Sequence, residues 1–326
     1  MRSLIVGTGS YAPEKILTNA DLERMIDTSD QWIVERTGIK ERHVAAENEA
    51  SSDLALKAAH KALKMAGVRA EDVDLIVVGT ITPDMPFPSA AAMLQAHLHN
   101  KKAFAFDVSA ACAGSLYALA VADRFVCTGV SRAALVVGVE ILTRVTDWKD
   151  RNSCILFGDG AGAMVLVPTQ DQNRGLLSTH LHTDGSYWPI LNMPGGGSRL
   201  PCSQKVVDEN LATIKMNGRE VYKVAVRALE EVSREALAAN GMQPKDVDHV
   251  IAHQANKRIL DSTLQRLAIP PEKCWMNLEK YGNTSSASVP MTLDEANRAG
   301  WFEPGDLILM MAIGGGMSWG SALHRW

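Results

Sequence analysis

Cys112 is the residue of this sequence with the clearest potential for covalent chemistry. It follows an apolar run of strand length, Ala103 to Val108, and precedes a largely apolar stretch, Ser115 to Val126, that predicts a buried helix. At such a turn a cysteine faces the N-terminal end of the helix, where free N–H groups and the helix dipole lower the thiol pKa. The sequence therefore predicts a thiolate nucleophile. The alternative is a cysteine that only packs, since free cysteine is among the most buried residue types.

Three other segments carry residues with complementary chemistry. His253 ends one predicted strand, and Asn283 lies in a turn of small polar residues that leads into a helical run. Gly314–Gly316 follows the predicted strand Leu307 to Ile313. Glycines after a strand let a substrate approach backbone N–H groups that serve as an oxyanion hole, or they form an ordinary tight turn.

An internal repeat places these residues at comparable positions. A helix, a glycine stop, an acidic turn and a strand recur 174 positions later, with matches of Ala62-Leu63 to Ala236-Leu237, Gly67 to Gly241, and Asp72-Val73-Asp74 to Asp246-Val247-Asp248. The match predicts a duplicated fold of two halves, residues 1–170 and 171–326. His253 falls where the first half has Gly79, at the carboxyl end of a strand, where ligand groups gather in open parallel sheets.

The alternation of strands and helices predicts an α/β fold of βαβ units, with largely parallel sheets and helices on both faces. Continuous apolar strands such as Ala134 to Val137 indicate burial on both faces. Residues 183–210 contain Gly195-Gly196-Gly197 and predict an irregular surface excursion that covers a site.

Composition narrows the class of protein. The chain has 326 residues, 46% of them hydrophobic and 21% charged, which is typical of a soluble globular protein. A net charge of −4 favours neither nucleic acid nor an anionic membrane as a partner. No segment approaches the roughly 20 apolar residues of a membrane span, and the N-terminus does not read as a signal peptide. We expect a cytoplasmic protein.

Metal and nucleotide motifs are weak. The five cysteines include no Cys-x-x-Cys pair, and the His97/His99 and His180/His182 pairs have no further ligands near them in sequence. Gly7-Thr8-Gly9 belongs to a loose dinucleotide fingerprint, but Pro13 interrupts the helix that should follow. We expect no metal and no bound cofactor.

Several motifs, in order along the whole chain, resemble one family. They are Gln31 to Ile39, Asp107 to Gly114 around Cys112, Phe157 to Ala163, His253-Gln254-Ala255-Asn256, Tyr281 to Ser288 around Asn283, and Gly314 to Gly320. The sequence resembles β-ketoacyl-[acyl-carrier-protein] synthase III, the initiating condensing enzyme of type II fatty acid synthesis. The resemblance implies a homodimer with the thiolase-like fold, in which two duplicated halves form a five-layered αβαβα sandwich.

The resemblance also implies an acyltransferase mechanism. Cys112 takes the acyl group from an acyl-CoA primer, acetyl-CoA by default. Malonyl-ACP then loses CO2, and neutral His253 with Asn283 stabilises the enolate. The carbanion attacks the acyl group, and the N–H groups of Cys112 and Gly315 hold the oxyanion. The products are 3-oxoacyl-ACP, CoA and CO2, and acyl-CoA is a substrate, so no cofactor is implied.

Residues that match the binding positions of the family divide into three groups. Those for CoA are Thr28, Trp32, Arg36 and Arg151 at the adenine and Met216, Gly218, Tyr222, Ala225 and Asn256 along the pantetheine channel. Those for the acyl pocket are Phe87, which reaches into the partner subunit, Leu142, Phe157 and Ile313. Those for the carrier protein are Lys223, Gln254, Lys257 and Arg258. The sequence departs from the usual pattern at Asn152, Tyr222 and Ile313, and the smaller Ile313 favours a wider pocket that would admit a longer or branched primer.

Two rival functions remain open from the sequence. One is a related condensing enzyme or acyltransferase of secondary metabolism with another primer or acceptor. The other is a non-catalytic acyl-CoA-binding protein, which intact Cys112, His253 and Asn283 argue against, because a binding protein needs none of them.

Overall fold

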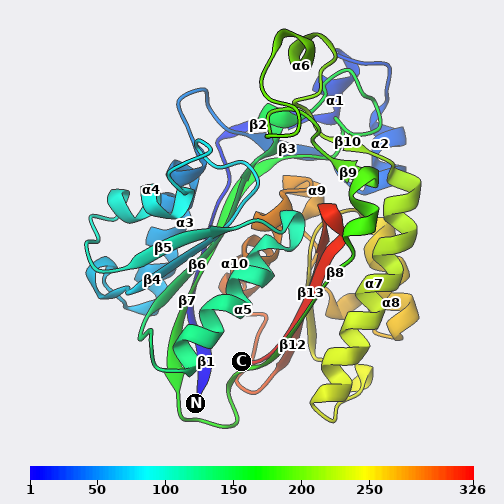
Figure 1. The fold of residues 1–326 in the computed structure, drawn as a ribbon. Helices are drawn as coiled ribbons and strands as arrows, with labels where there is room; N and C mark the ends of the chain where they lie inside the picture. The colour runs from blue at the N-terminus through cyan, green and yellow to red at the C-terminus, as the bar shows by residue number, and fades with distance from the viewer.

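Two mixed β-sheets form the middle of the molecule (Figure 1). The computed structural model describes all residues, 1–326. The first sheet has the order β1 (Arg2–Tyr11), β7 (Asp159–Thr169), β6 (Ala134–Ile141), β4 (Leu75–Gly79), β5 (Phe104–Val108). The second has the order β11 (His249–Ala252), β12 (Leu307–Gly314), β13 (Ser318–Arg325), β8 (Gly175–Thr183). Two small pairs, β2 (Lys15–Thr18) with β3 (Glu41–Val44) and β9 (Leu191–Asn192) with β10 (Lys215–Met216), lie apart from these sheets.

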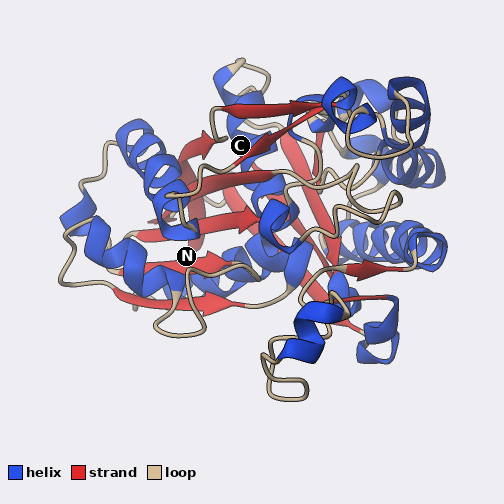
Figure 2. Ribbon diagram, turned by 90° about the horizontal axis from the view of Figure 1, so that it is seen from above, coloured by secondary structure: helices blue, strands red, loops and turns tan.

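Helices form three layers around and between the sheets (Figures 1 and 2). The helices α5 (Gly114–Cys127) and α10 (Ser288–Arg298) lie between the sheets and contact strands of both. The outer face of the first sheet carries α3 (Ser51–Ala66) and α4 (Ala90–His97), and the second carries α7 (Gly218–Ala239) with α8 (Lys257–Leu267) beside it. This arrangement confirms the predicted five-layered αβαβα sandwich.

Four short helices complete the fold. They are α1 (Asn19–Glu23), α2 (Asp30–Thr37), α6 (Gln204–Asp208) and α9 (Leu278–Tyr281). The Thr18 side chain caps α1. No helix combines the length and the apolarity that crossing a membrane requires.

The two halves have the same topology, as the sequence repeat predicts. In both, the strand pairs run parallel, antiparallel and antiparallel, through β4·β6, β6·β7 and β7·β1 in one half and β11·β12, β12·β13 and β13·β8 in the other. A single parallel bridge between Val250 and Cys274 takes the place of the β4·β5 pair. Gly67 and Gly241 both end their helices in the left-handed conformation, with φ of 65° and 68°. The predicted boundary, between residues 170 and 171, falls in the connection from β7 to β8.

The sheets are mixed, so the prediction of largely parallel sheets is wrong. The reason is local to β12 and β13, which a turn of only three residues, Gly315–Met317, joins as antiparallel neighbours. A parallel pair would need a long crossover connection. In the first half, β1 and β7 likewise pair antiparallel, although they lie far apart in the sequence.

Gly7 and Gly9 lie inside β1 rather than in a loop. A Cβ at Gly7 would lie 2.4 Å from the carbonyl oxygen of Ala62, and one at Gly9 would lie 2.3 Å from that of Ala58. Both glycines therefore let α3 pack closely on the strand. Close packing of α3 on β1 therefore explains these two glycines, and their match to the loose dinucleotide fingerprint needs no nucleotide.

Candidate active site

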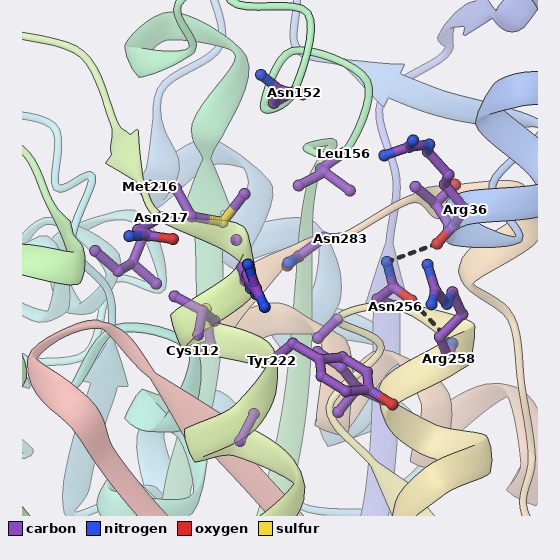
Figure 3. Close-up of a pocket in the computed structure, with 18 of the residues that line it drawn as sticks. Arg36, Cys112, Asn152, Leu156, Met216, Asn217, Tyr222, Asn256, Arg258 and Asn283 are labelled. Carbon is purple, nitrogen blue, oxygen red and sulfur yellow. Dashed lines mark hydrogen bonds between the residues drawn. The ribbon is translucent and has the colours of Figure 1, made fainter.

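Cys112 lies in a short 3-10 turn, η2 (Ala111–Ala113), between β5 and α5. A cavity of about 980 Å³ ends at this residue, and His253 and Asn283 line the same cavity. Figure 3 shows Cys112 and Asn283 facing it, with Arg36, Asn256 and Arg258 grouped on another side. The structure thus brings together the three residues for which catalytic roles are predicted, although they come from three separate segments of the chain.

Close packing of bare backbone brings the turns of the two halves together. A Cβ at Gly79, at the end of β4, would lie 2.5 Å from the carbonyl carbon of Gly114. A Cβ at Gly138 in β6 would lie 2.1 Å from the carbonyl oxygen of Ser286, in the second 3-10 turn, η7 (Ser285–Ala287). The turn that holds Cys112 and the turn that follows Asn283 therefore meet over the end of the first sheet.

The surroundings of Cys112 act on the pKa of its thiol in opposite directions. Burial raises the pKa of the Cys112 thiol to about 12, and the nearby Glu140 carboxyl contributes in the same direction. The nearby Ser285 hydroxyl lowers this pKa, but its effect is smaller. Burial of the sulfur therefore opposes the depressed pKa that the sequence predicts.

His253 follows β11 and is 3% exposed, and its backbone N–H donates to the carbonyl of Met311 at 2.8 Å. Ser288 Oγ accepts from the backbone N–H of Gln254 at 3.2 Å and lies 2.6 Å from His253 Nδ1. When the Ser288 hydroxyl donates to Nδ1, the imidazole proton lies on Nε2, the tautomer that can donate to a substrate. Burial lowers the pKa of His253 to about 3, so the ring is a neutral donor at physiological pH.

Asn283 is fixed by a backbone ladder with the segment that precedes β7. Its N–H donates to the Leu156 carbonyl at 2.8 Å, and its carbonyl accepts from the Gly158 N–H at 3.0 Å. The side-chain oxygen accepts from the Ser285 N–H at 2.9 Å. The carboxamide nitrogen is therefore left to donate into the cavity (Figure 3).

The glycine turn after β12 packs directly on the nucleophile. A Cβ at Gly314 would lie 2.4 Å from the backbone nitrogen of Cys112 and 2.9 Å from the carbonyl oxygen of Ala110. Gly316 adopts a φ of 72°, which favours glycine. Only bare backbone fits here, so the turn that contains Gly315 follows a residue packed directly on the backbone of Cys112.

The predicted adenine site is occupied by side chains of the protein itself. The guanidinium groups of Arg36 and Arg151 lie 4.5 Å and 4.2 Å from the centre of the Trp32 ring. The hydroxyl of Thr28 and Nε of Arg151 are buried without a hydrogen-bond partner. Buried polar atoms of this kind are costly without a partner, although neither Thr28 nor Arg151 lines the cavity itself.

The predicted pantetheine residues all line the cavity, namely Met216, Gly218, Tyr222, Ala225 and Asn256. The Tyr222 hydroxyl lies 2.7 Å from Ser262 Oγ. Asn256 caps α8 by accepting from the Arg258 N–H at 2.9 Å, and its amide donates to the Arg36 carbonyl at 3.0 Å (Figure 3). Asn256 therefore also ties α2 to α8.

The predicted acyl-pocket residues lie at three different depths. Phe157 and Ile313 line the cavity close to Cys112. Leu142 is buried in the same apolar cluster but does not reach the cavity surface. Phe87 is 84% exposed and lies outside the cavity of its own chain.

Three of the predicted carrier-protein contacts are exposed, and one is not. Lys223 and Arg258 line the cavity mouth, and Arg258 forms no ion pair, whereas Lys257 pairs with Asp261 and Lys223 with Glu220. Gln254 was predicted as a fourth contact, which is wrong. It is 1% exposed, and its carboxamide bonds the backbone at Ala252, Trp275, Asn277 and Leu278. Its role is to hold the connection between β11 and α9.

Sequence reasoning missed residues that support or line the site. Ser285 and Ser288 orient Asn283 and His253, and both lie in the quoted motif around Asn283 without an assigned role. Leu191, Asn217 and Arg219 also line the cavity. Leu191 belongs to the irregular segment 183–210, and a Cβ at Gly315 would lie 3.2 Å from its carbonyl oxygen, so that segment does reach the site.

The second histidine pair, His180 and His182, has a protein partner. His180 and His182 contact the two carboxylate oxygens of Glu235 on α7 at 3.1 Å and 2.6 Å. The structure groups no three His, Cys, Asp or Glu side chains where a metal ion would bind.

Comparison with known proteins gives one consistent family. The model described as 3-Oxoacyl-[acyl-carrier-protein (ACP)] synthase III matches residues 106–185, and the model of its C-terminal part matches residues 237–326. The chain is 53% identical to a β-ketoacyl-[acyl-carrier-protein] synthase III of Xanthomonas campestris pv. campestris over 324 residues, 99% of this chain and 98% of that protein.

Solved structures give the same result. The crystal structure of 3-oxoacyl-[acyl-carrier-protein] synthase III from Aquifex aeolicus has a TM-score of 0.93 and 46% identity, and covers 99% of this chain and 100% of that one. The priming β-ketosynthase of the R1128 polyketide biosynthetic pathway has a TM-score of 0.92 at 35% identity, and covers 99% and 96% of the two chains. This chain therefore belongs to the 3-oxoacyl-[acyl-carrier-protein] synthase III family.

Proposed function

We propose that this protein is a β-ketoacyl-[acyl-carrier-protein] synthase III, which condenses an acyl-CoA primer with malonyl-ACP to start fatty acid synthesis in the cytoplasm. The observation that carries the proposal is the cavity that ends at Cys112, His253 and Asn283. Trp32 and Arg36 line the same cavity, and two buried polar atoms near them lack partners. One channel therefore leads from a site suited to a nucleotide to a nucleophile.

The first half-reaction loads the enzyme. The Cys112 thiolate attacks the thioester carbon of acyl-CoA, and the tetrahedral oxyanion receives hydrogen bonds from the N–H groups of Cys112 and Gly315. Collapse of this intermediate expels CoA and leaves the acyl group on Cys112. Phe157 and Ile313 provide an apolar wall for it.

The second half-reaction forms the carbon–carbon bond. Malonyl-ACP places its pantetheine in the emptied channel and loses CO2, which leaves an enolate. The Nε2–H of neutral His253 and the amide of Asn283 donate to the enolate oxygen. The pKa of His253 is lowered to about 3, so at physiological pH its ring carries no extra proton that would quench the carbanion. The carbanion attacks the acyl group on Cys112, and 3-oxoacyl-ACP leaves.

Charge at the cavity mouth supports an acidic carrier protein as the second partner. Arg258, Lys223 and Arg219 line the cavity on its exposed side, and Arg258 has no ion-pair partner. An acidic protein would gain ion pairs there and be steered toward the channel.

An apolar surface supports a homodimer. Phe87 is 84% exposed, and β5 is an edge strand whose Phe104 is 41% exposed. Unpaired strand edges with exposed aromatic side chains are typical of surfaces that a partner covers. Light scattering after size exclusion tests the proposal, and a Phe104→Glu variant that stays dimeric would contradict this choice of surface.

The second candidate is a priming ketosynthase of another pathway. The similarity to the R1128 priming β-ketosynthase, at 35% identity over nearly the whole chain, favours keeping it. Both candidates share the acyl-enzyme, so they differ only in primer and in the destination of the product.

The test uses two measurements. Intact-protein mass spectrometry after addition of acetyl-CoA should show one acetyl adduct in wild type and none in Cys112→Ser. A primer series from acetyl- to decanoyl-CoA, with branched forms, is then assayed with malonyl-ACP. Condensation of acetyl-CoA supports the proposed function. Condensation of long primers alone, or with malonyl-CoA in place of malonyl-ACP, supports the second candidate, and absence of an adduct contradicts both.

A further inference from the structure

Glu140 is a buried carboxyl that the mechanism above does not use. It lies near the end of β6 and is 0% exposed. Its Oε2 accepts from the Thr82 hydroxyl at 2.6 Å, the Ile81 N–H at 3.2 Å and the Thr80 hydroxyl at 3.4 Å. Its Oε1 accepts from the Ser285 hydroxyl at 3.2 Å. Because no cation pairs with this carboxyl, only these donors offset the cost of burying it.

The neighbours of Glu140 all present protons to it. The Thr82 hydroxyl oxygen accepts from the Ile141 N–H at 2.9 Å, and the Thr80 hydroxyl oxygen accepts from the Thr82 N–H at 3.1 Å. Each of these two hydroxyls therefore directs its own proton to the carboxyl. An ionised carboxylate, which only accepts hydrogen bonds, fits this surrounding set of donors.

Ser285 connects this carboxyl with the active site. Its hydroxyl donates to Glu140, and its backbone N–H donates to Asn283 Oδ1 at 2.9 Å. Ser285 adopts a φ of 49°, a conformation that is costly for a non-glycine residue and persists only where the surrounding structure holds it. The hydrogen bond to Glu140 is a side-chain contact that holds it. Two printed contacts therefore join the buried carboxyl to the catalytic carboxamide.

The direction of the Asn283 carboxamide decides what it does in the cavity. While the Ser285 N–H binds Oδ1, the amide nitrogen is left to donate into the cavity. If the turn were free to move, Oδ1 would also face the cavity for part of the time. A carbonyl oxygen there would repel an enolate oxygen instead of stabilising it.

We propose that Glu140 is a positioning residue, which holds Ser285 so that the amide nitrogen of Asn283 stays directed at the enolate. The inference rests on the proposed function in naming the malonyl-ACP enolate as the species that Asn283 meets. Glu140 does not line the cavity and acts entirely through Ser285. Acyl loading of Cys112 uses other donors, so only the second half-reaction should depend on this carboxyl.

Measuring the two half-reactions separately tests the inference. Glu140→Gln keeps the shape of the side chain but places N–H donors among groups that are donors themselves. Stopped-flow release of CoA from acetyl-CoA should show the wild-type loading rate. Condensation of malonyl-ACP with the acetylated variant should fall by about 10–10²-fold, because the carboxamide is misplaced. Equal slowing of both half-reactions, or no slowing of condensation, would overturn the inference.

Two further variants test whether the effect runs through the turn. Ser285→Ala removes the connection and should show the same selective loss, and Ala111 shows that alanine adopts this conformation, with a φ of 46°. Asn283→Ala should lower condensation by about 10²–10³-fold, and adding Glu140→Gln should lower it no further. A further loss in the double variant would mean that Glu140 acts by another route.

Asp294→Asn is the matched control. Asp294 is 1% exposed and accepts from the hydroxyls of Thr8 and Ser10 at 2.8 Å and 2.6 Å, so it is also a buried carboxyl among hydroxyl donors. It lies outside the cavity, and its variant should keep both wild-type rates. Selective loss of condensation in this variant would show that any buried carboxyl has the same effect, which contradicts the inference.

A measurement without substrate separates this inference from the proposed function. The side-chain amide signal of Asn283 is followed by NMR in protein labelled with a nitrogen isotope in asparagine only, and is assigned by its absence in Asn283→Ala. We expect one sharp signal in wild type and a shifted or broadened one in Glu140→Gln and Ser285→Ala. An unchanged signal in both variants would overturn the inference. Failure of the wild-type protein to condense malonyl-ACP would refute the proposed function and leave this result standing.

Discussion

The two halves of the molecule place the same kind of turn in the middle of the fold, but the two turns carry different residues. The turn η2 and helix α5 start at Ala111 and Gly114, and their counterparts η7 and α10 start 174 positions later, at Ser285 and Ser288. Even the strained residue recurs, with φ of 46° at Ala111 and 49° at Ser285. Cys112 therefore has a structural counterpart in Ser286.

Only one of these two positions can do chemistry. Cys112 lines the cavity, whereas Ser286 is 0% exposed, and its hydroxyl has no hydrogen-bond partner. A Cβ at Gly114 would lie 2.8 Å from that hydroxyl, so packing closes the second turn. The duplicated fold supplies two equivalent helix starts, and the channel decides which of them receives a substrate.

A second pair of counterparts supports the first. Glu140 in β6 corresponds to Gly314 in β12, again 174 positions later. The first half places a buried carboxyl beside Ser285, and the second half places bare backbone against the nitrogen of Cys112. The molecule thus has one site built from different contributions of its two halves, and not two similar sites.

The largest expected effect comes from exchanging the two turn residues. Cys112→Ser should lower condensation by about 10⁴-fold or more, because the covalent intermediate is lost. The double variant Cys112→Ser with Ser286→Cys should stay inactive and form no acetyl adduct in mass spectrometry, because the new thiol lies outside the channel. Recovery of an adduct on residue 286 would show that the second turn is accessible.

Gly314→Ala tests the contact in front of the nucleophile. The added Cβ would meet the Cys112 nitrogen at 2.4 Å, so the oxyanion donors must shift, and we expect acylation to slow by about 10²–10³-fold. Gly197→Ala, where a Cβ has open space, should acylate at the wild-type rate. Stopped-flow release of CoA measures both, and equal rates in the two variants would refute the packing argument.

Two buried histidines should make the free energy of unfolding depend on pH below neutrality. Burial lowers the pKa values of His253 and His324 to about 3, whereas in the unfolded chain they titrate near 6.5. The unfolded state binds the extra protons, so the free energy of unfolding falls as pH drops from about 6.5 toward 3.

His324→Gln should remove one of these contributions. Between pH 8 and pH 5 the variant should lose about 2 kcal/mol less stability than wild type, with condensation activity retained. Urea unfolding at the two pH values measures this. His253→Asn should flatten the same window but abolish condensation. Identical pH dependence in wild type and His324→Gln would contradict the assigned neutral state.

The smallest effect is expected at Ser286, in the turn η7. Ser286→Ala removes a buried hydroxyl without a partner, so the free energy of unfolding should rise by about 1 kcal/mol. Ser233→Ala is the matched control, because that equally buried hydroxyl donates to the Leu229 carbonyl at 2.7 Å and its loss should not stabilise the protein. Urea unfolding of both variants decides, and a destabilised Ser286→Ala would mean that its hydroxyl has an unseen partner.

Prediction from the sequence went furthest where a pattern recurs. The repeat around Gly67 and Gly241 predicted the duplicated topology, and the strand ends predicted that Cys112 and His253 lie at comparable edges of the two halves. It failed where tertiary packing decides, as with the mixed sheets. Gln254, Ser285 and Ser288 show the same limit, because whether a polar side chain faces a ligand or the backbone depends on neighbours distant in sequence.

The stack of two guanidinium groups on Trp32 has a consequence for nucleotide recognition. In the proposed complex with acyl-CoA, an adenine that stacks on Trp32 must replace one of these two guanidinium groups. Stacking of the base would then exchange a guanidinium group for an aromatic ring on Trp32. The net binding free energy from the base is therefore expected to be small. Affinity for the whole acyl-CoA then depends on its phosphates and its long pantetheine arm. Free adenine alone should compete poorly with acyl-CoA.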